Sequence, residues 1–307
     1  MKSIILFIIL AVTSFAFAQS EVISEEVALK NGAIQLPGTL TFAKEQMPLV
    51  IWIHGSGNVD RNGNQKGLNI NANYIKQFRD SINQVGIAFY SYDKRTSIPE
   101  NLAISTEMKF IEFVDDAVVA INHFRNGGRF SEIILIGHSQ GSLVAMLASE
   151  KVDKYISLAG PSQSFDATVV KQVMVQSPSL GVTTQNLFNE LKETGAVTNV
   201  DPLLLSIFAA PNLEFLSSYI KYNPSEEIKK IKIPTLVIHG TSDLQVRVED
   251  AQKLHEELEG SQLEIIEKMN HLLKTVETLE DNQKSYSDPN FPVSAQLIEV
   301  ITKFIKK

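Results

Sequence analysis

Short, almost continuous runs of hydrophobic residues recur along the chain between residues 49 and 266. Continuous rather than alternating runs are typical of strands that are covered on both faces, as in parallel sheets. Six such strands are predicted, at Leu49–Ile53, Ile87–Tyr92, Ile133–Ile136, Tyr155–Leu158, Thr235–Ile238 and Leu263–Ile266.

The segment before residue 49 alternates instead between hydrophobic and polar positions. Val22–Leu29 and Ala33–Phe42 flank Asn31-Gly32, a dipeptide that is typical of tight hairpin turns. This pattern predicts an antiparallel hairpin at one edge of the sheet.

Hydrophobic residues at helical spacing fill most of the stretches between the predicted strands. Helices are predicted at Tyr74–Val85, Met108–Phe124, Leu143–Glu150, Glu249–Leu258 and Val293–Ile305. Strands that alternate with helices form a mostly parallel sheet with right-handed crossovers and helices on both faces. The pattern therefore predicts an α/β fold.

Residues 161–234 interrupt this alternation. The segment has helical character, is broken by Pro202, Pro211 and Pro224, and contains no convincing strand. We interpret it as a helical cap that is inserted into the α/β core.

The core on either side of the cap comprises residues 19–160 and 235–307. The cap follows the strand that ends at Leu158 and precedes the strand that begins at Thr235. We expect its chain to leave and re-enter at the carboxyl edge of the sheet. Ligands bind at that edge in open α/β folds.

The amino terminus carries a targeting signal. Lys2 precedes an apolar run, Ile4–Val12, and Ala16-Phe17-Ala18 fits the small-x-small cleavage pattern. The run is shorter than the roughly 20 residues that a membrane-spanning helix needs. We expect residues 1–18 to be a signal peptide, so that the mature protein is exported, periplasmic or secreted, without stable membrane insertion.

Composition narrows the function classes further. The 307 residues are 44% hydrophobic and 21% charged, which suits a globular protein with a large core. A net charge of −7 without a basic stripe argues against nucleic acid as a partner. The absence of cysteine excludes disulfides, a cysteine nucleophile and thiolate metal sites. No zinc-hydrolase histidine spacing occurs, and we expect neither a metal nor a cofactor.

A nucleophile motif follows the strand Ile133–Ile136. Gly137-His138-Ser139-Gln140-Gly141 matches G-x-S-x-G between a predicted strand and a predicted helix. In such a strained turn the glycines are needed because side chains there would collide with neighbouring backbone. The motif predicts Ser139 as a nucleophile at the amino terminus of a helix, whose free N–H groups suit a developing oxyanion.

A serine hydroxyl needs a base and an orienting acid, which follow it in the order acid, then histidine, in this type of site. Asp243 is the predicted acid, because it lies in the turn after the strand Thr235–Ile238. Asp166 is the competing position, whereas Glu249 and Asp250 suit the start of a helix.

His271 is the predicted general base. It follows the strand Leu263–Ile266 and comes after Asp243 in the chain, as the order requires. The other histidines lie on predicted helices, inside the serine motif or at strand ends, where each can bond to backbone: His54, His123, His138, His239 and His255.

Two backbone amides are predicted to form an oxyanion hole. One is the N–H of Gln140, the residue after the nucleophile. The other comes from the loop His54-Gly55-Ser56-Gly57, which is small enough for its backbone to approach a substrate oxygen, and Ser56 is the preferred donor.

Charged residues cluster in the same region. Asn58–Asn64 includes Asp60 and Arg61, and Asp93-Lys94-Arg95 follows the strand Ile87–Tyr92. We expect these charges to pair with one another and to hold the loop His54–Gly57, which we call the oxyanion loop, in place rather than to recognise substrate directly.

The segments HGSGNVDRNGN, YDKR, GHSQGS, HGTSD and NHLLK occur in the order and spacing of the α/β-hydrolase superfamily. The sequence most resembles bacterial esterases close to the serine aminopeptidase S33-like group. The resemblance implies an α/β-hydrolase fold in which Ser139, Asp243 and His271 fill the triad positions. The sequence departs from its relatives at Thr96, where they usually have glycine.

These observations lead us to expect a serine hydrolase that cleaves small-molecule carboxylic esters of short to medium acyl chain through an acyl-enzyme. An exported aminopeptidase or amidase is the alternative within this fold, and it would need an acidic cap residue such as Glu190, Glu193 or Glu214. A binding protein on a catalytically inactive hydrolase scaffold is the alternative from another class.

The cap is richer in apolar residues than a solvent-facing insertion needs. We expect about half of them to form the core of the cap and the rest to line an apolar acyl pocket over Ser139. The residues concerned are Phe165, Phe188, Leu203, Leu204, Leu205, Ile207, Phe208, Phe215, Leu216 and Tyr219.

Overall fold

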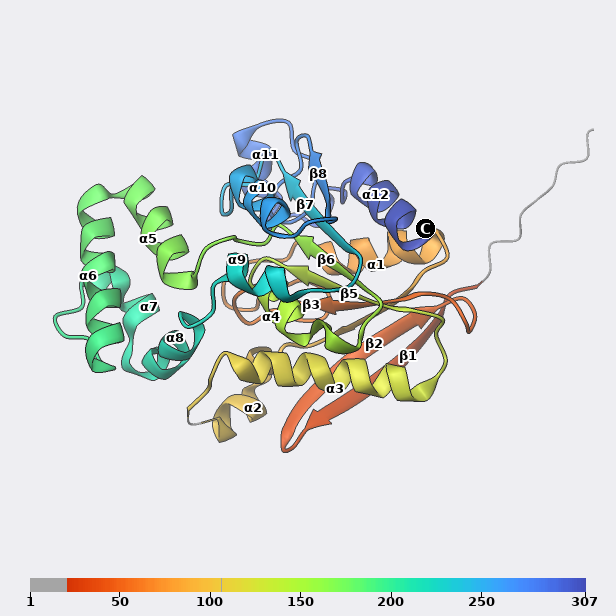
Figure 1. The fold of residues 1–307 in the computed structure, drawn as a ribbon, viewed down its shortest axis with the longest axis horizontal. Coiled ribbons are helices and arrows are strands. Elements are labelled where there is room, and N and C mark those ends of the chain that lie inside the picture. The colour runs from red at the N-terminus through yellow and green to blue at the C-terminus, as the bar shows by residue number, and fades with distance from the viewer. Residues whose placement is uncertain (1–20, 106) are drawn as a thin grey trace, which may run out of the picture.

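A computed structural model describes residues 21–105 and 107–307, so the predicted signal peptide, residues 1–18, lies outside the described residues. The strands of this part form one sheet in the order β1-β2-β4-β3-β5-β6-β7-β8 (Figure 1). The strands are β1 Ile23–Asn31, β2 Ile34–Phe42, β3 Leu49–Ile53, β4 Ala88–Tyr92, β5 Ile133–His138, β6 Lys154–Leu158, β7 Thr235–Gly240 and β8 Gln262–Ile266.

The sheet is mostly parallel. β1 pairs antiparallel with β2, and β2 pairs antiparallel with β4, whereas β3 to β8 run parallel to one another. The hairpin turns at Gly32, whose φ of +59° is the left-handed conformation that glycine adopts at little cost. The predicted α/β architecture with an antiparallel hairpin at its edge is confirmed.

Helices cover both faces of the sheet, and their amphipathic stripes supply its two core layers. On one face lie α1 Tyr74–Gln84 and α12 Ala295–Ile305. On the other lie α3 Ile111–Gly127, α4 Gln140–Ala148 and α10 Val248–Glu257. Two short helices that the hydrophobic pattern did not predict are α2 Pro99–Ile104 and α11 Leu279–Lys284.

The strand sequences are continuously hydrophobic because both of their faces are buried. In β3, Val50 and Trp52 pack in the core layer of α1 and α12, whereas Ile51 and Ile53 pack in the opposite layer. The edge strand β8 differs, because alternate residues such as Glu264 remain exposed. The prediction that this strand is covered on both faces is therefore wrong.

Between β6 and β7 the chain builds a separate group of helices at one end of the molecule (Figure 1). These are α5 Phe165–Gln176, α6 Pro178–Thr194, α7 Leu205–Phe208 and α8 Leu213–Tyr219. They enclose a small hydrophobic core of their own, which includes Phe188, Leu204 and Phe208. We call α5 to α8 the cap.

The chain returns from the cap through α9 Pro224–Glu227 and the 3₁₀ turn Ile228–Lys230. This segment contacts α4 and α10, and Ile228 is buried in the same core layer. The predicted re-entry at the carboxyl edge is wrong, because β6 and β7 are parallel. A chain that leaves the carboxyl end of β6 must cross the sheet to reach the amino end of β7.

Among the described residues, one stretch, Pro202–Lys230, is long and apolar enough to span a membrane by length and composition. In the structure it is divided into the short helices α7, α8 and α9, which begin or are interrupted near Pro211 and Pro224. Its residues Phe208 and Leu216 pack inside the cap.

Candidate active site

Ser139 occupies a strained turn between β5 and α4. Its φ of 54° and ψ of −122° are unusual for a residue with a side chain. Such strain costs on the order of 1–3 kcal/mol and occurs most often at functional sites. A Cβ on Gly137 would lie 2.3 Å from the backbone oxygen of Gly141, and one on Gly141 would lie 2.3 Å from that of Ile53. Both glycines are sterically required, as the sequence predicted.

Asp243 and His271 lie side by side at the carboxyl ends of β7 and β8. His271 Nδ1 donates to Asp243 Oδ2 across 2.7 Å, and the Asp243 side chain is fully buried. Because a carboxylate only accepts, Nδ1 carries the proton and Nε2 of His271 is left as an acceptor. The other carboxylate oxygen accepts the backbone N–H groups of Gln245 and Val246.

The environment keeps the Asp243 carboxyl ionised. Burial, the largest single effect, raises its pKa, but His271, His239 and the backbone N–H of Val246 together lower it by more. The net result is a pKa below the ordinary value for aspartate. Asp243 is therefore a negatively charged acceptor that orients the imidazole of His271.

His138 connects the serine turn to His271. Its Nε2 donates to the backbone carbonyl of His271 across 2.8 Å, and its Nδ1 lies 3.3 Å from the hydroxyl of Tyr74. Burial lowers the pKa of His138 to about 3, so the ring is neutral at neutral pH. The residue before Ser139 thus fixes the backbone of His271.

The described residues contain no hydrogen bond between the Ser139 hydroxyl and His271. Such bonds are often long in unliganded hydrolases and tighten only when substrate is bound. The arrangement brings Asp243 and His271 into direct contact, and His138, the neighbour of Ser139 in the chain, bonds to the backbone of His271.

The two predicted oxyanion donors lie on the wall of one cavity with Ser139. Ser56 and Gln140 line this cavity, whose volume is about 350 Å³. The loop that carries Ser56 packs directly on Ser139, because a Cβ on Gly55 would lie 3.2 Å from Cβ of Ser139. We call this volume the serine cavity.

Cap residues supply much of the apolar wall of the serine cavity. Phe165, Val169, Val173, Ile207 and Tyr219 line it from α5, α7 and α8.

A second cavity, of about 380 Å³, shares Ser56, Gln140, Phe165 and Ile207 with the serine cavity. Other apolar cap residues lie elsewhere: some in the core of the cap (Phe188, Leu204 and Phe208) and some exposed to solvent (Leu203 and Leu205).

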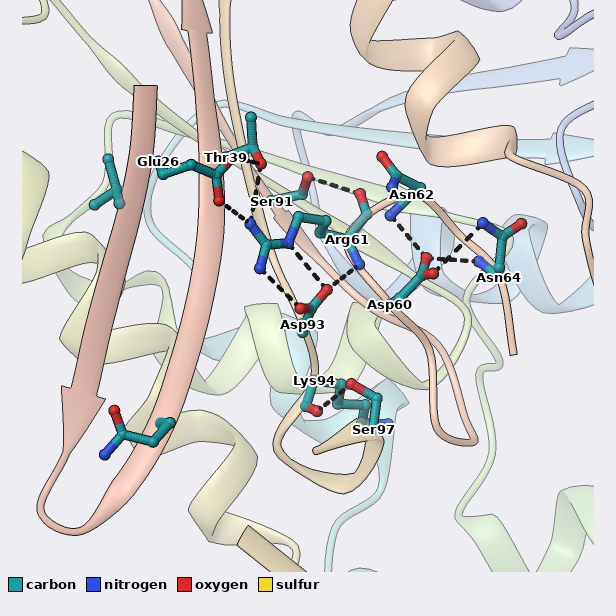
Figure 2. A network of polar contacts seen from close by, with 12 residues as sticks. Glu26, Thr39, Asp60, Arg61, Asn62, Asn64, Ser91, Asp93, Lys94 and Ser97 are labelled. Carbon is teal, nitrogen blue, oxygen red and sulfur yellow. Dashed lines mark hydrogen bonds and ion pairs between the residues drawn. The ribbon is translucent and has the colours of Figure 1, made fainter. Parts of the chain in front are cut away.

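Charged residues hold the loop after β3 against β4 (Figure 2). Arg61 pairs with Asp93 at 2.8 Å, and its other guanidinium nitrogen reaches Glu26 on β1 at 2.6 Å. Within the loop, Asp60 accepts the backbone N–H groups of Asn62 and Asn64 (Figure 2). The predicted pairing between this loop and the residues after β4 is confirmed for Arg61 and Asp93.

Thr96 lies in the 3₁₀ turn Arg95–Ser97, where no glycine conformation is needed. Its hydroxyl donates to the backbone oxygen of Gly57 across 3.2 Å, so it contacts the oxyanion loop. Arg95 points elsewhere and pairs with Asp116 of α3 at 2.6 Å.

The competing acid candidates lie away from His271. Asp166 is on α5 of the cap and pairs with Lys192 at 2.5 Å. Asp250 lies in the first turn of α10 and accepts from Ser162. Within residues 21–105 and 107–307, no group of three or more His, Asp or Glu side chains is arranged to hold a metal ion.

Two buried residues contact the site. The sequence interpretation expected Lys94 only to help hold the loop after β3 and His138 only to bond to backbone, and it named neither partner. His138 bonds to His271, and Lys94 reaches the oxyanion loop at Gly55. The sequence shows that His138 adjoins Ser139, but nothing in it indicates which distant carbonyl either side chain meets.

Comparisons with known proteins agree with this fold. The sequence profile of the family described as serine aminopeptidase, S33, matches residues 66–277, which is more than half of the chain. No curated protein matches the sequence.

Solved structures with similar folds include two esterases and a bromoperoxidase. The esterase Pf2001 of Pyrococcus furiosus is 16% identical, with a TM-score of 0.60 and coverage of 96% of this chain and 95% of that one. Est1E of Butyrivibrio proteoclasticus is 16% identical, with a TM-score of 0.55 and coverage of 92% and 96%. The Bacillus anthracis bromoperoxidase is 17% identical, with a TM-score of 0.54 and coverage of 92% of this chain and 100% of that one.

At these identities the structural likeness establishes the fold, and the profile match establishes the family. The mostly parallel sheet, the helices on both of its faces and the serine turn after β5 agree with both. The chain belongs to the serine aminopeptidase S33 family and is a hydrolase of the α/β-hydrolase fold.

Proposed function

We propose that this hydrolase cleaves carboxylic esters through an acyl-enzyme on Ser139. The observation that carries the proposal is the hydrogen bond between His271 and the buried Asp243, beside a serine held at positive φ. An oriented imidazole near a serine that lines a cavity from a strained turn is the arrangement that activates serine nucleophiles.

The reaction follows from the direction of each hydrogen bond. Nε2 of His271 takes the hydroxyl proton as Ser139 Oγ attacks the ester carbonyl, and Asp243 stabilises the imidazolium. The N–H groups of Ser56 and Gln140 hold the oxyanion. The imidazolium then protonates the departing alcohol. Water, activated by His271, attacks the acyl-enzyme and releases the acid and free Ser139.

The lining of the serine cavity supports the proposal that the substrate has an uncharged, apolar acyl group. Phe165, Val169, Val173 and Ile207 present hydrocarbon to it, and its polar wall consists of hydroxyl and amide groups rather than charges. A volume of about 350 Å³ suits an acyl chain of short to medium length. Two of the structural neighbours are themselves described as esterases.

The aminopeptidase alternative finds less support. An aminopeptidase needs a carboxylate that holds the substrate ammonium, yet two of the three acidic candidates in the cap are engaged elsewhere. Glu190 accepts from Thr198, and Glu214 pairs with Lys109 at 3.3 Å. Neither residue nor Glu193 lines the serine cavity. This arrangement favours esters over aminoacyl amides.

A fluorophosphonate probe tests the nucleophile, since only an activated serine reacts with it. We expect stoichiometric labelling of the wild-type protein and none of Ser139→Ala. A parallel assay compares p-nitrophenyl butyrate with leucine p-nitroanilide, and the ester is expected to be cleaved far faster. An unlabelled wild-type protein would indicate a binding protein, and efficient cleavage of the anilide alone would indicate an aminopeptidase.

A further inference from the structure

Lys94 is a buried lysine at the back of the predicted oxyanion hole. It follows β4 and is only 6% exposed. Its Nζ donates to the backbone oxygen of Gly55 across 2.7 Å and to Oε1 of Gln140 across 2.8 Å. The ammonium also lies 4.3 Å from the centre of the Phe113 ring. Two of its N–H groups therefore have oxygen partners within the protein, and its side chain also lines the second cavity.

The two oxygen acceptors are the significant feature. The carbonyl of Gly55 and the N–H of Ser56 belong to the same planar peptide group. A cation that bonds to this carbonyl fixes the plane of the peptide and increases the positive charge on its N–H. Oε1 of Gln140 belongs to the residue whose backbone N–H is the other predicted donor. One ammonium thus contacts both halves of the oxyanion hole.

The backbone of Lys94 is itself held in place. Its N–H donates to the carbonyl of Val59 across 3.1 Å, and its carbonyl accepts the hydroxyl of Ser97 across 2.8 Å (Figure 2). The neighbouring Asp93 is fixed by Arg61 (Figure 2). The lysine therefore extends from a rigid support toward the loop that carries Ser56.

The charge of Lys94 is not cancelled by an adjacent carboxylate. Asp116, on the facing helix α3, gives both of its oxygens to Arg95, at 2.6 and 2.7 Å. Among the described residues, no carboxylate oxygen lies within 4.0 Å of the Lys94 ammonium. Burial lowers the pKa of Lys94 to about 7, while Asp116 acts in the opposite direction. An unpaired buried cation costs stability, which such sites commonly sacrifice for function.

We propose that Lys94 is a positioning residue of the ester hydrolysis, which holds the amides of Ser56 and Gln140 in place and adds positive charge beside the developing oxyanion. This inference rests on the proposed esterase function. Because the oxyanion exists only in the transition state, the residue is expected to stabilise that state rather than the bound ester.

The test uses Lys94→Met, which keeps the length and hydrocarbon of the side chain but removes the ammonium. We expect kcat for p-nitrophenyl butyrate to fall about 10- to 100-fold, somewhat less than for loss of an oxyanion donor, with KM changed by less than about threefold. An alkyl trifluoromethyl ketone, which forms a tetrahedral oxyanion on the serine, is expected to lose affinity by the same factor as kcat/KM.

The matching methyl ketone, which resembles the ground state, is expected to bind Lys94→Met as well as wild type. Lys154→Met is the matched control. Lys154 also donates to a backbone carbonyl, that of Ile305 across 2.6 Å, but at the opposite end of the sheet. Its loss is expected to lower the melting temperature without changing kcat, KM or the affinity for either ketone.

If Lys94→Met does not fold, Lys94→Gln replaces it. The carboxamide keeps a donor without the charge, and at least about a tenfold loss of trifluoromethyl ketone affinity is expected. The inference is overturned if a folded variant binds the trifluoromethyl ketone within about threefold of wild type, or if both ketones weaken equally. An active Ser139→Ala protein would instead overturn the esterase proposal itself, whatever Lys94 does.

Discussion

The imidazole of His138 donates its Nε2 proton to the backbone carbonyl of His271 across 2.8 Å. The two rings lie 4.9 Å apart, centre to centre. One residue of the serine turn is thereby joined to a loop 133 residues later in the chain. This bond therefore connects the serine turn to the loop of His271 directly, in addition to the connection through the sheet.

Replacing His138 with phenylalanine should weaken that link. The ring of phenylalanine can still stack near Trp52, which lies 5.9 Å from the imidazole, but it leaves the His271 carbonyl without its donor. We expect kcat for p-nitrophenyl butyrate to fall about tenfold, since misplacing a base by a fraction of an ångström is costly, with KM little changed. A variant with wild-type kcat would show that the sheet alone positions His271.

Ser139→Ala and His271→Ala should each lower kcat by about 10³ to 10⁶, and the double variant should lose little more. The members of a catalytic triad act as a unit, so removing a second member after the first causes little further loss of activity. Steady-state hydrolysis of p-nitrophenyl esters measures this. If Ser139→Ala kept more than about a tenth of the turnover, the nucleophile would be another residue.

Asp243 and Asp166, the two aspartates considered as the acid that orients His271, should respond differently to substitution. Asp243→Asn is expected to lower kcat about 10²- to 10⁴-fold, because an amide neither stabilises the imidazolium nor fixes the tautomer of His271. Asp166→Asn is the matched control, since Asp166 pairs with Lys192 in the cap, and it should keep wild-type kcat. Equal losses in the two variants would contradict the assignment of the acid.

A chain-length series of p-nitrophenyl esters should show kcat/KM rising over the first few acyl carbons and then dropping. Each methylene buried against Val169 or Ile207 adds about 0.8 kcal/mol until the serine cavity is full. Val169→Phe should shift the optimum to shorter chains, because its larger ring occupies part of the cavity. An optimum that stays unchanged in this variant would place the acyl group elsewhere.

The stability of the cap should depend on pH through Asp166. Burial is the largest single effect and raises the pKa of this carboxyl, but the hydrogen bonds from Lys192, Ser164 and the backbone of Ala167, together with the charge of Lys192, lower it more, and the net pKa is below the ordinary value. A depressed folded pKa stabilises the protein above the unfolded pKa of about 3.9, and this contribution is lost as pH falls through the folded pKa.

Wild type should therefore melt at a higher temperature than Asp166→Asn at neutral pH, and the difference should vanish in acid. Differential scanning calorimetry between about pH 7 and pH 3 measures it. A melting difference that is constant over this range would mean that the charge of Asp166 contributes nothing.

Most of the core fold could be predicted from the sequence because a strand that is buried on both faces is hydrophobic at nearly every position. Strands such as β3 are hydrophobic throughout, since Val50 and Ile51 face different core layers that are both dry. The path of the chain after the cap was predicted wrongly, although the same pattern predicted a mostly parallel sheet. Because β6 and β7 are parallel, α9 must lead back across the sheet.

In the candidate site, too, some features could be predicted from local sequence patterns and others could not. Ser139, Asp243 and His271 follow strands in a recognisable order, so their positions could be inferred from local patterns. The contacts of Lys94 with Gly55 and of His138 with His271 join residues 39 and 133 positions apart. No local pattern records which distant carbonyl a buried donor will meet, so these contacts required the structure.

The cap is one uninterrupted stretch of chain between two neighbouring strands, whereas Ser139, Asp243 and His271 all lie outside it. A single recombination event in the gene can therefore exchange α5 to α8 without altering any codon of these three residues. Phe165, Val169 and Ile207, which line the serine cavity, would be replaced together. Recombination can thus change the lining of the serine cavity while Ser139, Asp243 and His271 are inherited unchanged.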